Sequence, residues 1–392
     1  MKKTKIHRKI YFDYAATTPV DARVIRAITP YLAEEFGNTM SFHSLGAKAS
    51  EAVEKSRKII AEMLRAKESE IIFTSSATES NNLALKGIAF ANKEKGRHII
   101  ISPVEHDCVL ESAKWLGKQG FEITKLPVDS FGLIKLDELE NAIRKDTILV
   151  SIIHANNEIG TIQDIKHIGE ICRKNNVHFH TDASQSFGKM PMDVEKMNVD
   201  LLTASSHKIY GPKGAALLYV RTGINIEPIL HGGGHENGLR SSTVNVSAIV
   251  GFAKAAEICS KTMSWENERI TALRDRLIDG ILKKVKGSRL NGHPTQRLNN
   301  NVNISFPFAE GESMLMELDL AGIAVSTGSA CSSRTLEPSH VLLAIGLKPQ
   351  AAHGSLRITL GRWTTKSEIN YLLDTLPNIV NKFRSISPFK YD

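Results

Sequence analysis

The strongest constraint on the fold is a regular alternation of short apolar runs and amphipathic segments over the first two-thirds of the chain. The apolar runs predict strands at 70–74, 98–102, 122–126, 147–153, 177–181, 200–205 and 215–220. Helical periodicity lies between most of these runs, as in 78–90, 136–145 and 165–174. Strands that alternate with helices predict an α/β fold with a largely parallel sheet covered on both faces.

The alternation stops near residue 265. A long polar helix is expected over 266–285, followed by further short apolar runs and a C-terminal helix. The expected division is a large domain over 16–265 and a smaller α+β domain built from 1–15 and 266–392. A chain of 392 residues is long enough to form both.

Composition is that of a soluble globular protein, with 42% hydrophobic and 23% charged residues. No apolar stretch is long enough to span a bilayer, and the basic N-terminus MKKTKIHRKIYFDY lacks the apolar region of a secretory signal. The cysteines Cys108, Cys172, Cys259 and Cys331 follow no disulfide pattern, which indicates a reducing compartment. We therefore expect a cytoplasmic protein, with Cys172 and Cys259 on the apolar, packed faces of helices.

The formal net charge of +8 does not indicate nucleic-acid binding. Lysine and arginine are scattered along helical faces, without interleaved aromatic residues and without a basic block longer than the first nine residues. An anionic small ligand or an acidic protein partner explains the sign of the charge equally well.

Two polar clusters follow predicted strands, at the carboxyl ends where open α/β sheets bind ligands. In TSSATESNN, Ala77 and Thr78 open a helix whose free N–H groups suit a phosphate, although ordinary N-capping explains the same residues. In HFHTDASQS, Asp182 comes at a strand end with Gln185 close behind. This carboxylate suits a protonated ring nitrogen of a cofactor; a helix cap is the alternative.

Two further clusters follow later in the chain. SSHKIYGPKG places Ser205, His207 and Lys208 after a strand, where a shielded lysine can form a Schiff base. A solvated loop lysine is the alternative, and it describes Lys213 better. HGGGHENGLRSST is rich in glycine but has neither Walker nor Rossmann spacing. A phosphate cradle, a ring-nitrogen carboxylate and a Schiff-base lysine together predict a site for pyridoxal 5′-phosphate (PLP).

Cys331 stands in STGSACSSRTLEP, among small residues that cannot form a core. Small residues predict an accessible loop, and Arg334, three residues on, favours the thiolate. A free thiol on a surface turn is the alternative explanation.

The motifs resemble those of cysteine desulfurases of the IscS/NifS type, which belong to the class V aminotransferases among the fold-type I PLP enzymes. The resemblance runs from about Tyr11 to Pro388. The motifs that carry it are YFDYAATTP, FTSSATESNNLALKG, ISPVEHDCVL, HANNEIGTIQDI, HTDASQSFGK, SSHKIYGPKG, HGGGHENGLRSST, VSTGSACSSRTLEPSHVL and SLRITLGR.

The resemblance implies a role for each matching residue. Lys208 would hold PLP, Asp182 would pair with the pyridinium nitrogen, Gln185 would bind the phenolate oxygen, and His106 would stack on the ring and move protons. The phosphate ligands would be Ala77, Thr78, Ser205 and His207, with Thr243 reaching in from the second subunit of a homodimer. The substrate carboxylate would be held by Asn157 and Arg357, with Asn38 near it.

The reaction implied by the resemblance converts L-cysteine to L-alanine through an external aldimine and a persulfide on Cys331. The sulfur would pass to an acceptor protein, such as an IscU-type scaffold or a sulfur carrier for tRNA thiolation. The resemblance implies no resident metal, although Cys331 would transiently ligate a cluster on a partner. It implies no membrane and no direct nucleic-acid partner.

Three departures from the family pattern bear on these assignments. Thr39 and Met40 replace Pro and a small residue near the substrate pocket, which weakens the assignment of Asn38 and of His43. Ser76 replaces a glycine of the phosphate loop, a mild change if its backbone stays outside the left-handed region. The C-terminal SISPFKYD is shorter than the tail that docks an IscU-type scaffold.

Two neighbouring activities and one different class remain as alternatives. A selenocysteine lyase or a cysteine β-lyase would use the same scaffold, but a lyase needs no protein nucleophile such as Cys331. A non-catalytic sulfur-trafficking scaffold would not need Lys208, Asp182, His106 and Arg357 together.

Overall fold

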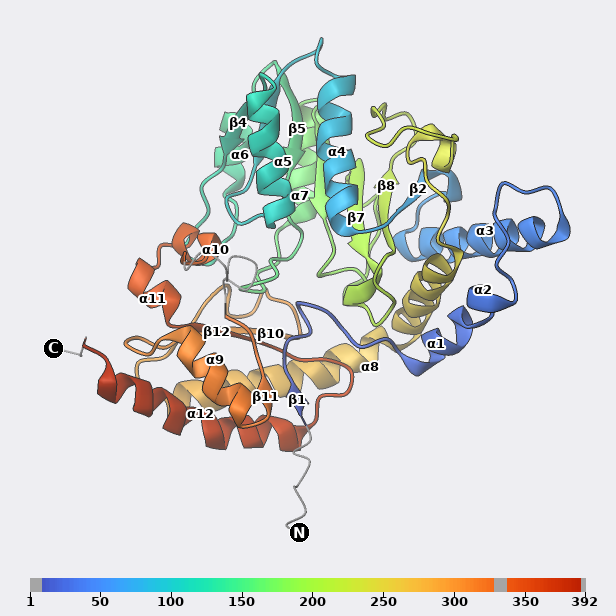
Figure 1. Cartoon of the computed structure of the whole chain (residues 1–392). Helices are drawn as coiled ribbons and strands as arrows, with labels where there is room; N and C mark the ends of the chain where they lie inside the picture. Colours follow the sequence, from blue (N-terminus) through green and yellow to red (C-terminus); the bar gives the residue numbers. More distant parts are fainter. Residues whose placement is uncertain (1–8, 328–336, 389–392) are drawn as a thin grey trace.

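The computed structural model describes residues 9–327 and 337–388 (Figure 1). Within these ranges the largest sheet has seven strands in the order β2-β8-β7-β6-β5-β3-β4. Their bounds are β2 Ile71–Thr74, β3 His98–Ile101, β4 Glu122–Lys125, β5 Thr147–Ser151, β6 His178–Asp182, β7 Leu201–Ser205 and β8 Ala216–Val220. Neighbouring strands from β4 to β7 are parallel, whereas β8 is antiparallel to both β7 and β2. The predicted α/β fold and its seven strands are confirmed.

Successive residues of the central strands face opposite sides of this sheet. Ile99 and Ile101 pack in one apolar cluster with Leu85 of α4 (Ala77–Ala91) and Leu116 of α5 (Asp107–Lys118). Ile100 packs in the cluster on the other side. Burial on both faces explains why these strands are continuous apolar runs.

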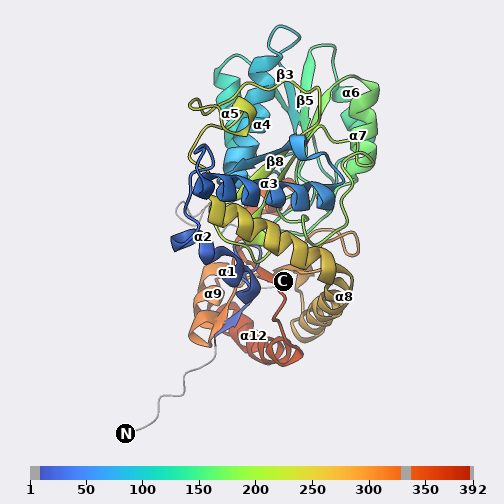
Figure 2. The ribbon, with the colours of Figure 1, turned by 90° about the vertical axis from the view of Figure 1, so that its right-hand side faces the viewer.

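Helices α3 (Ser44–Leu64), α7 (Ile165–Lys174) and α8 (Val246–Lys284) cover the second face. Figure 2 shows α3 running alongside α8, and the two helices are in contact. Cys172 of α7 and Cys259 of α8 are buried in this core, so their predicted packing role is confirmed.

Helix α8 corrects the prediction of a helix over 266–285. The helix begins at Val246 because 246–265 contains no proline and its one glycine does not break the helix. Phe252 in its first half packs in the core of the large sheet, and Leu277 in its second half packs in a separate core. The expected boundary at 265/266 therefore falls inside one continuous helix, and the division into 16–265 and 1–15 with 266–392 stays a proposal.

The second core supports two small sheets in the lower part of Figure 1. Strands β9 (Arg289–Leu290), β10 (Asn301–Ser305) and β12 (Ser355–Thr359) form an antiparallel sheet, and β1 (Ile10–Tyr11) pairs in parallel with β11 (Ile323–Ala324). Helices α9 (Gly311–Leu320) and α12 (Lys366–Ile386) cover them. The remaining helices are α1 Ala22–Ile28, α2 Pro30–Ala33, α6 Leu136–Ala142, α10 His340–Ala344 and α11 Pro349–His353, with 3-10 turns at Glu68–Glu70, Ser206–Lys208 and Glu236–Gly238.

The segment after β1 connects the two parts of the molecule. Phe12 is buried in the smaller core, while the backbone N–H of Thr18 donates to the carbonyl of His207 beyond β7. This segment therefore lies beside the carboxyl ends of β6 and β7. No described helix combines the length and the apolar character that crossing a bilayer requires.

Candidate active site

Asp182 and Lys208 follow neighbouring parallel strands. Asp182 ends β6 and is 4% exposed; its Oδ1 accepts the backbone N–H of Ser184 over 2.8 Å. Lys208 closes the 3-10 turn after β7, the strand that pairs with β6. The carboxyl ends of these strands thus bring a buried carboxylate and an amine to one edge of the sheet.

The segment Ala15–Thr17 binds three of the predicted site residues. Lys208 Nζ donates to the carbonyls of Ala15 over 2.6 Å and Ala16 over 2.8 Å. Gln185 Nε2 donates to the same Ala15 carbonyl over 2.9 Å. His207 Nδ1 lies 3.1 Å from Thr17 Oγ1, and burial with the nearby lysine charges lowers the pKa of His207 to about 4. This imidazole is therefore neutral at physiological pH.

His106 caps helix α5 and faces the same site. Its Nδ1 accepts the backbone N–H of Cys108 over 3.2 Å. Burial and the charge of Lys208 lower the pKa of His106, while the charge of Asp182 raises it. Contacts through Cys108 and Asn81 connect its imidazole to the Asp182 carboxylate.

The N-terminus of α4 forms the other side of the site. Ser76 is the N-cap with φ −162°, and its Oγ accepts the N–H of Glu79 over 3.2 Å. Because this backbone is extended and outside the left-handed region, serine replaces glycine here without strain. Ala77 and Thr78 are the first two residues of a 15-residue helix, whose positive end favours a phosphate. Ser205 ends β7 and is 1% exposed.

Arg357 contacts the backbone of Asn157, the other residue predicted to hold the substrate carboxylate. Arg357 Nη1 lies 3.5 Å from the Asn157 carbonyl, and Arg357 Nη2 donates to Asp13 Oδ1 over 3.0 Å. Arg357 is 3% exposed, and its Nε has no hydrogen-bond partner within 9–327 and 337–388. A buried guanidinium with a spare donor is suited to a carboxylate.

Cys331 lies outside the described residues, but the residues on either side of its segment are placed. Ser326 and Arg357 exchange two backbone hydrogen bonds, of 3.1 and 2.7 Å. Ser339 Oγ donates to Glu158 Oε2 over 2.5 Å, next to Asn157. One flank of the Cys331 segment is thus bound to Arg357, a residue predicted to hold the substrate, and the other to Glu158, the neighbour of Asn157.

Two glutamates beside predicted site residues have buried carboxyl groups: Glu105 precedes His106, and Glu158 follows Asn157. Burial raises the pKa of Glu105 to about 8, although Ser102 and the N–H of Ile153 donate to its Oε1. Burial also raises the pKa of Glu158, against the hydrogen bond from Ser339. Both side chains therefore favour the neutral acid more than an exposed glutamate does.

Two predicted residues are not joined to this cluster by the structure. Asn38 is exposed, and its Oδ1 accepts the N–H of Met40 over 2.9 Å. Thr243 is exposed in the loop before α8, where it lines a cavity of about 270 Å³ together with Ser75.

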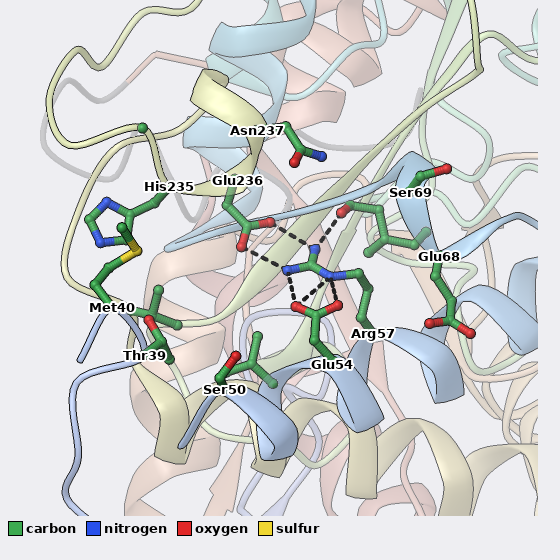
Figure 3. A pocket seen from close by; sticks show the side chains of 14 residues that line it. Thr39, Met40, Ser50, Glu54, Arg57, Glu68, Ser69, His235, Glu236 and Asn237 are labelled. Atoms are coloured by element: carbon green, nitrogen blue, oxygen red, sulfur yellow. Dashed lines mark hydrogen bonds and ion pairs between the residues drawn. The ribbon is translucent and has the colours of Figure 1, made fainter. Parts of the chain in front are cut away.

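A cavity of about 480 Å³, shown in Figure 3, does not have Lys208 among its lining residues. Thr39 and Met40 line it, and Arg57 lies between Glu54 and Glu236 at its floor. The two substitutions in the substrate-pocket motif therefore shape this neighbouring cavity. Among the described residues no cluster of His, Cys, Asp or Glu side chains could hold a metal ion.

Several site residues were not singled out from the sequence. Asp13 and Ala15 lie in the quoted YFDYAATTP motif, which offers a polar residue and small residues but no role for either. Asn81 Nδ2 donates to Asp182 Oδ2 over 2.7 Å, and Cys108 Sγ lies 3.1 Å from His106 Nδ1. The short spacing of Cys108 from His106 is a local signal; the contact of Asn81 spans distant segments.

The residues present fit PLP by the chemistry of their donors. Lys208 offers an amine for the aldehyde, Gln185 an amide for the phenolate oxygen, and Asp182 a buried carboxylate for the ring nitrogen. Helix α4 offers its N-terminus to the phosphate. An ionised carboxylate has about four lone-pair sites, and Asp182 uses two of them on Asn81 and Ser184. It retains capacity for a ring N–H.

Comparisons with known proteins identify the family. The sequence profile described as Aminotransferase class-V matches residues 10–372. The cysteine desulfurase IscS of Methanosarcina thermophila is 52% identical over 382 residues, which cover 97% of this chain and 94% of that protein. The cysteine desulfurase IscS 1 of Archaeoglobus fulgidus is 54% identical over 378 residues, covering 96% and 98%.

Solved structures show the same relationship. A NifS-like protein superposes with a TM-score of 0.90 at 40% identity, over 95% of this chain and 100% of that one. SspA in complex with cysteine superposes with a TM-score of 0.80 at 38% identity, over 91% and 100%. The chain therefore belongs to the class V aminotransferase family and, within it, to the PLP-dependent cysteine desulfurases of the IscS/NifS type.

Proposed function

We propose that this chain converts L-cysteine to L-alanine and passes the sulfur, through a persulfide on Cys331, to an acceptor protein. One observation carries the proposal. The segment Asp13–Ala16 binds Lys208 through the carbonyls of Ala15 and Ala16 and binds Arg357 through Asp13. The segment thus holds the amine that would carry the cofactor close to a guanidinium that suits a carboxylate. An α-amino acid has an amino group to react with the cofactor and a carboxylate for the guanidinium.

The binding residues orient the substrate. Arg357, with its spare Nε–H, and Asn157 hold the α-carboxylate. When bound to Lys208, PLP supplies an electron sink for the bond that breaks at the substrate. Gln185 and Asp182 would hold the ring through its oxygen and nitrogen, and the phosphate would be held by Ala77, Thr78, Ser205 and His207.

Proton transfers fall to Lys208 and His106. The amine of Lys208 would move the proton from the substrate Cα. The charge of Asp182 keeps the ring-nitrogen proton in place. Burial lowers the pKa of His106, which favours the neutral imidazole, and a neutral ring can accept a proton and return it.

Cys331 takes the sulfur in a step that needs no added oxidant. Its thiolate attacks the substrate sulfur, so an S–S bond forms and the C–S bond breaks. The electron pair of the C–S bond stays on carbon, which is protonated to give alanine. The contacts of Ser326 with Arg357 and of Ser339 with Glu158 support this role, because one flank is bound to a proposed substrate residue and the other to the neighbour of Asn157.

L-Cysteine as the substrate is supported by the relatives named cysteine desulfurase and by the similar SspA, solved in complex with cysteine. Acceptors of the persulfide are proposed to be an IscU-type scaffold or a sulfur carrier for tRNA thiolation. The three described cysteines are free, which supports a reducing compartment such as the cytoplasm.

A homodimer is part of the proposal. Leu32, Phe36, Met40 and Phe42 are 65%, 67%, 57% and 106% exposed around the segment between α2 and α3. Apolar side chains gathered at a surface favour association. A second copy on this face would also supply Thr243, which is exposed in the single chain, to the phosphate of its partner.

The proposed function is tested by mass spectrometry after a single turnover with L-cysteine. We expect one added sulfur on the peptide that contains Cys331, and the same labelling in the control variant Cys172→Ala. Cys331→Ser should bind PLP and carry no added sulfur. Turnover of L-cysteine without sulfur on Cys331, with pyruvate as product, would support a β-lyase instead.

A further inference from the structure

Asn81 and Cys108 connect Asp182 to His106 through consecutive hydrogen-bond contacts. The Asn81 amide nitrogen lies 2.7 Å from Asp182 Oδ2 and 3.1 Å from Cys108 Sγ. Cys108 Sγ lies 3.1 Å from His106 Nδ1. The contacts join the phosphate-binding helix α4, the end of β6 and the start of α5 into one network.

Cys108 is a thiol in this network. Burial and the negative charge of Asp182 raise the pKa of Cys108 to about 12, against hydrogen bonds from Asn81 and Thr78. The sulfur therefore accepts the N–H of Asn81, and the S–H is available to donate. His106 Nδ1 is an acceptor within reach, 3.1 Å from the sulfur.

His106 Nδ1 accepts from two donors, the thiol and the backbone N–H of Cys108. A neutral imidazole that accepts at Nδ1 carries its proton on Nε2. The charges that act on His106 are Asp182 and Asp107, which raise its pKa, and Lys208 and His340, which lower it; burial lowers it most.

We infer that Asn81 and Cys108 are positioning residues, which hold His106 as the Nε2–H tautomer and tie its ring to the Asp182 carboxylate. The inference rests on the proposed function, because it concerns the groups that would hold the cofactor and transfer protons beside it. Helix α4 then serves the cofactor twice: its N-terminus meets the phosphate, and one turn later Asn81 orients the carboxylate for the ring nitrogen.

The test is nitrogen NMR of the full-length, PLP-bound protein labelled with ¹⁵N-histidine, with the signal of His106 assigned from His106→Gln. In the unsubstituted protein we expect the proton of neutral His106 on Nε2. Cys108→Ala removes the thiol donor, which favours the neutral ring, so the pKa of His106 should rise by at least about half a unit. Cys108→Ser retains a donor and should restore the original value, and Cys172→Ala should not change it.

The link through Asn81 is tested by a double-mutant cycle. Asn81→Ala should raise the pKa of His106 while Cys108 is present and change it much less in the Cys108→Ala background. A proton on Nδ1, or equal effects of Asn81→Ala in both backgrounds, would overturn the inference. Urea unfolding of each variant separates these shifts from loss of structure. The readout does not depend on turnover: a failed network would leave the desulfurase proposal standing, and a protein that forms no alanine could still show the network.

Discussion

Arg357 and Asp13 form an ion pair, with 3.0 Å between Arg357 Nη2 and Asp13 Oδ1. Asp13 lies two residues before Ala15, whose carbonyl binds Lys208. Arg357 is on β12 and Asp13 follows β1, so the pair joins segments that are 344 residues apart. A substrate carboxylate at Arg357 therefore lies close to the segment that positions the reactive amine.

Arg357→Lys tests the carboxylate site. Lysine keeps the charge but loses the planar fork, so we expect kcat/KM for L-cysteine to fall by roughly 10- to 100-fold, mainly through KM. The control is Arg276→Lys on the exposed face of α8, where the guanidinium contacts Asn370. Steady-state kinetics of both variants decide the point; equal, small effects would remove Arg357 from the substrate site.

Lys208→Ala tests the covalent attachment of PLP. The matched control is Lys213→Ala, an exposed lysine five positions further along the chain. We expect borohydride to fix PLP permanently to the unsubstituted protein and to Lys213→Ala, but not to Lys208→Ala. The mass of each denatured protein gives the answer, and cofactor retained by Lys208→Ala would assign the attachment to another lysine.

Gly160→Ala tests the turn that presents Asn157. Gly160 has φ +77°, and a Cβ here would lie 2.8 Å from Asn301, whose amide donates to the Glu158 carbonyl over 3.1 Å. Gly223 also has a positive φ, +92°, but open space around its Cβ position. We expect Gly160→Ala to lower the free energy of unfolding by about 1–2 kcal/mol more than Gly223→Ala does. Equal losses in urea titrations would contradict a steric role for Asn301.

Glu105→Gln tests the buried carboxyl group. Its pKa is about 8 in the folded protein against a usual value of 4.5, so the folded state binds more protons between these pH values. Stability from this group is complete below pH 4.5 and is lost as pH rises towards 8. We expect the free energy of unfolding of Glu105→Gln, relative to the unsubstituted protein, to increase between pH 5 and 8.5 by on the order of 2 kcal/mol.

The control for this titration is Glu111→Gln on the exposed side of α5, where the side chain pairs with Lys114. Its effect on stability should be small at both pH values. If the difference in free energy of unfolding between Glu105→Gln and the unsubstituted protein does not change with pH, Glu105 is ionised in the folded protein.

Much of the fold could be predicted because the strands are apolar on both faces. The run 98–102 and residues 201–205 of the run 200–205 are buried, and each run became a strand within a residue or two of its predicted bounds. The start of α8 could not be predicted from a change in polarity at 265, because a helix continues where its buried face passes from one core to another.

The site was predictable where residues follow strand ends. Asp182 and Lys208 come to the same edge of the sheet because β6 and β7 are parallel neighbours. Asn81 was not predictable as a ligand of Asp182: the two are 101 positions apart, and only the packing of α4 on the sheet brings them together. Thr39 and Met40 stand in a motif that the resemblance assigns to the substrate pocket. The path of the chain before α3 instead places them at the wall of the cavity in Figure 3.

The most direct test of the account is product analysis after incubation of the PLP-bound protein with L-cysteine and a thiol reductant. We predict alanine and sulfide in equal amounts, and no alanine from Cys331→Ala. Pyruvate and ammonia in place of alanine, or alanine formed at an unchanged rate by Cys331→Ala, would contradict transfer of sulfur through Cys331.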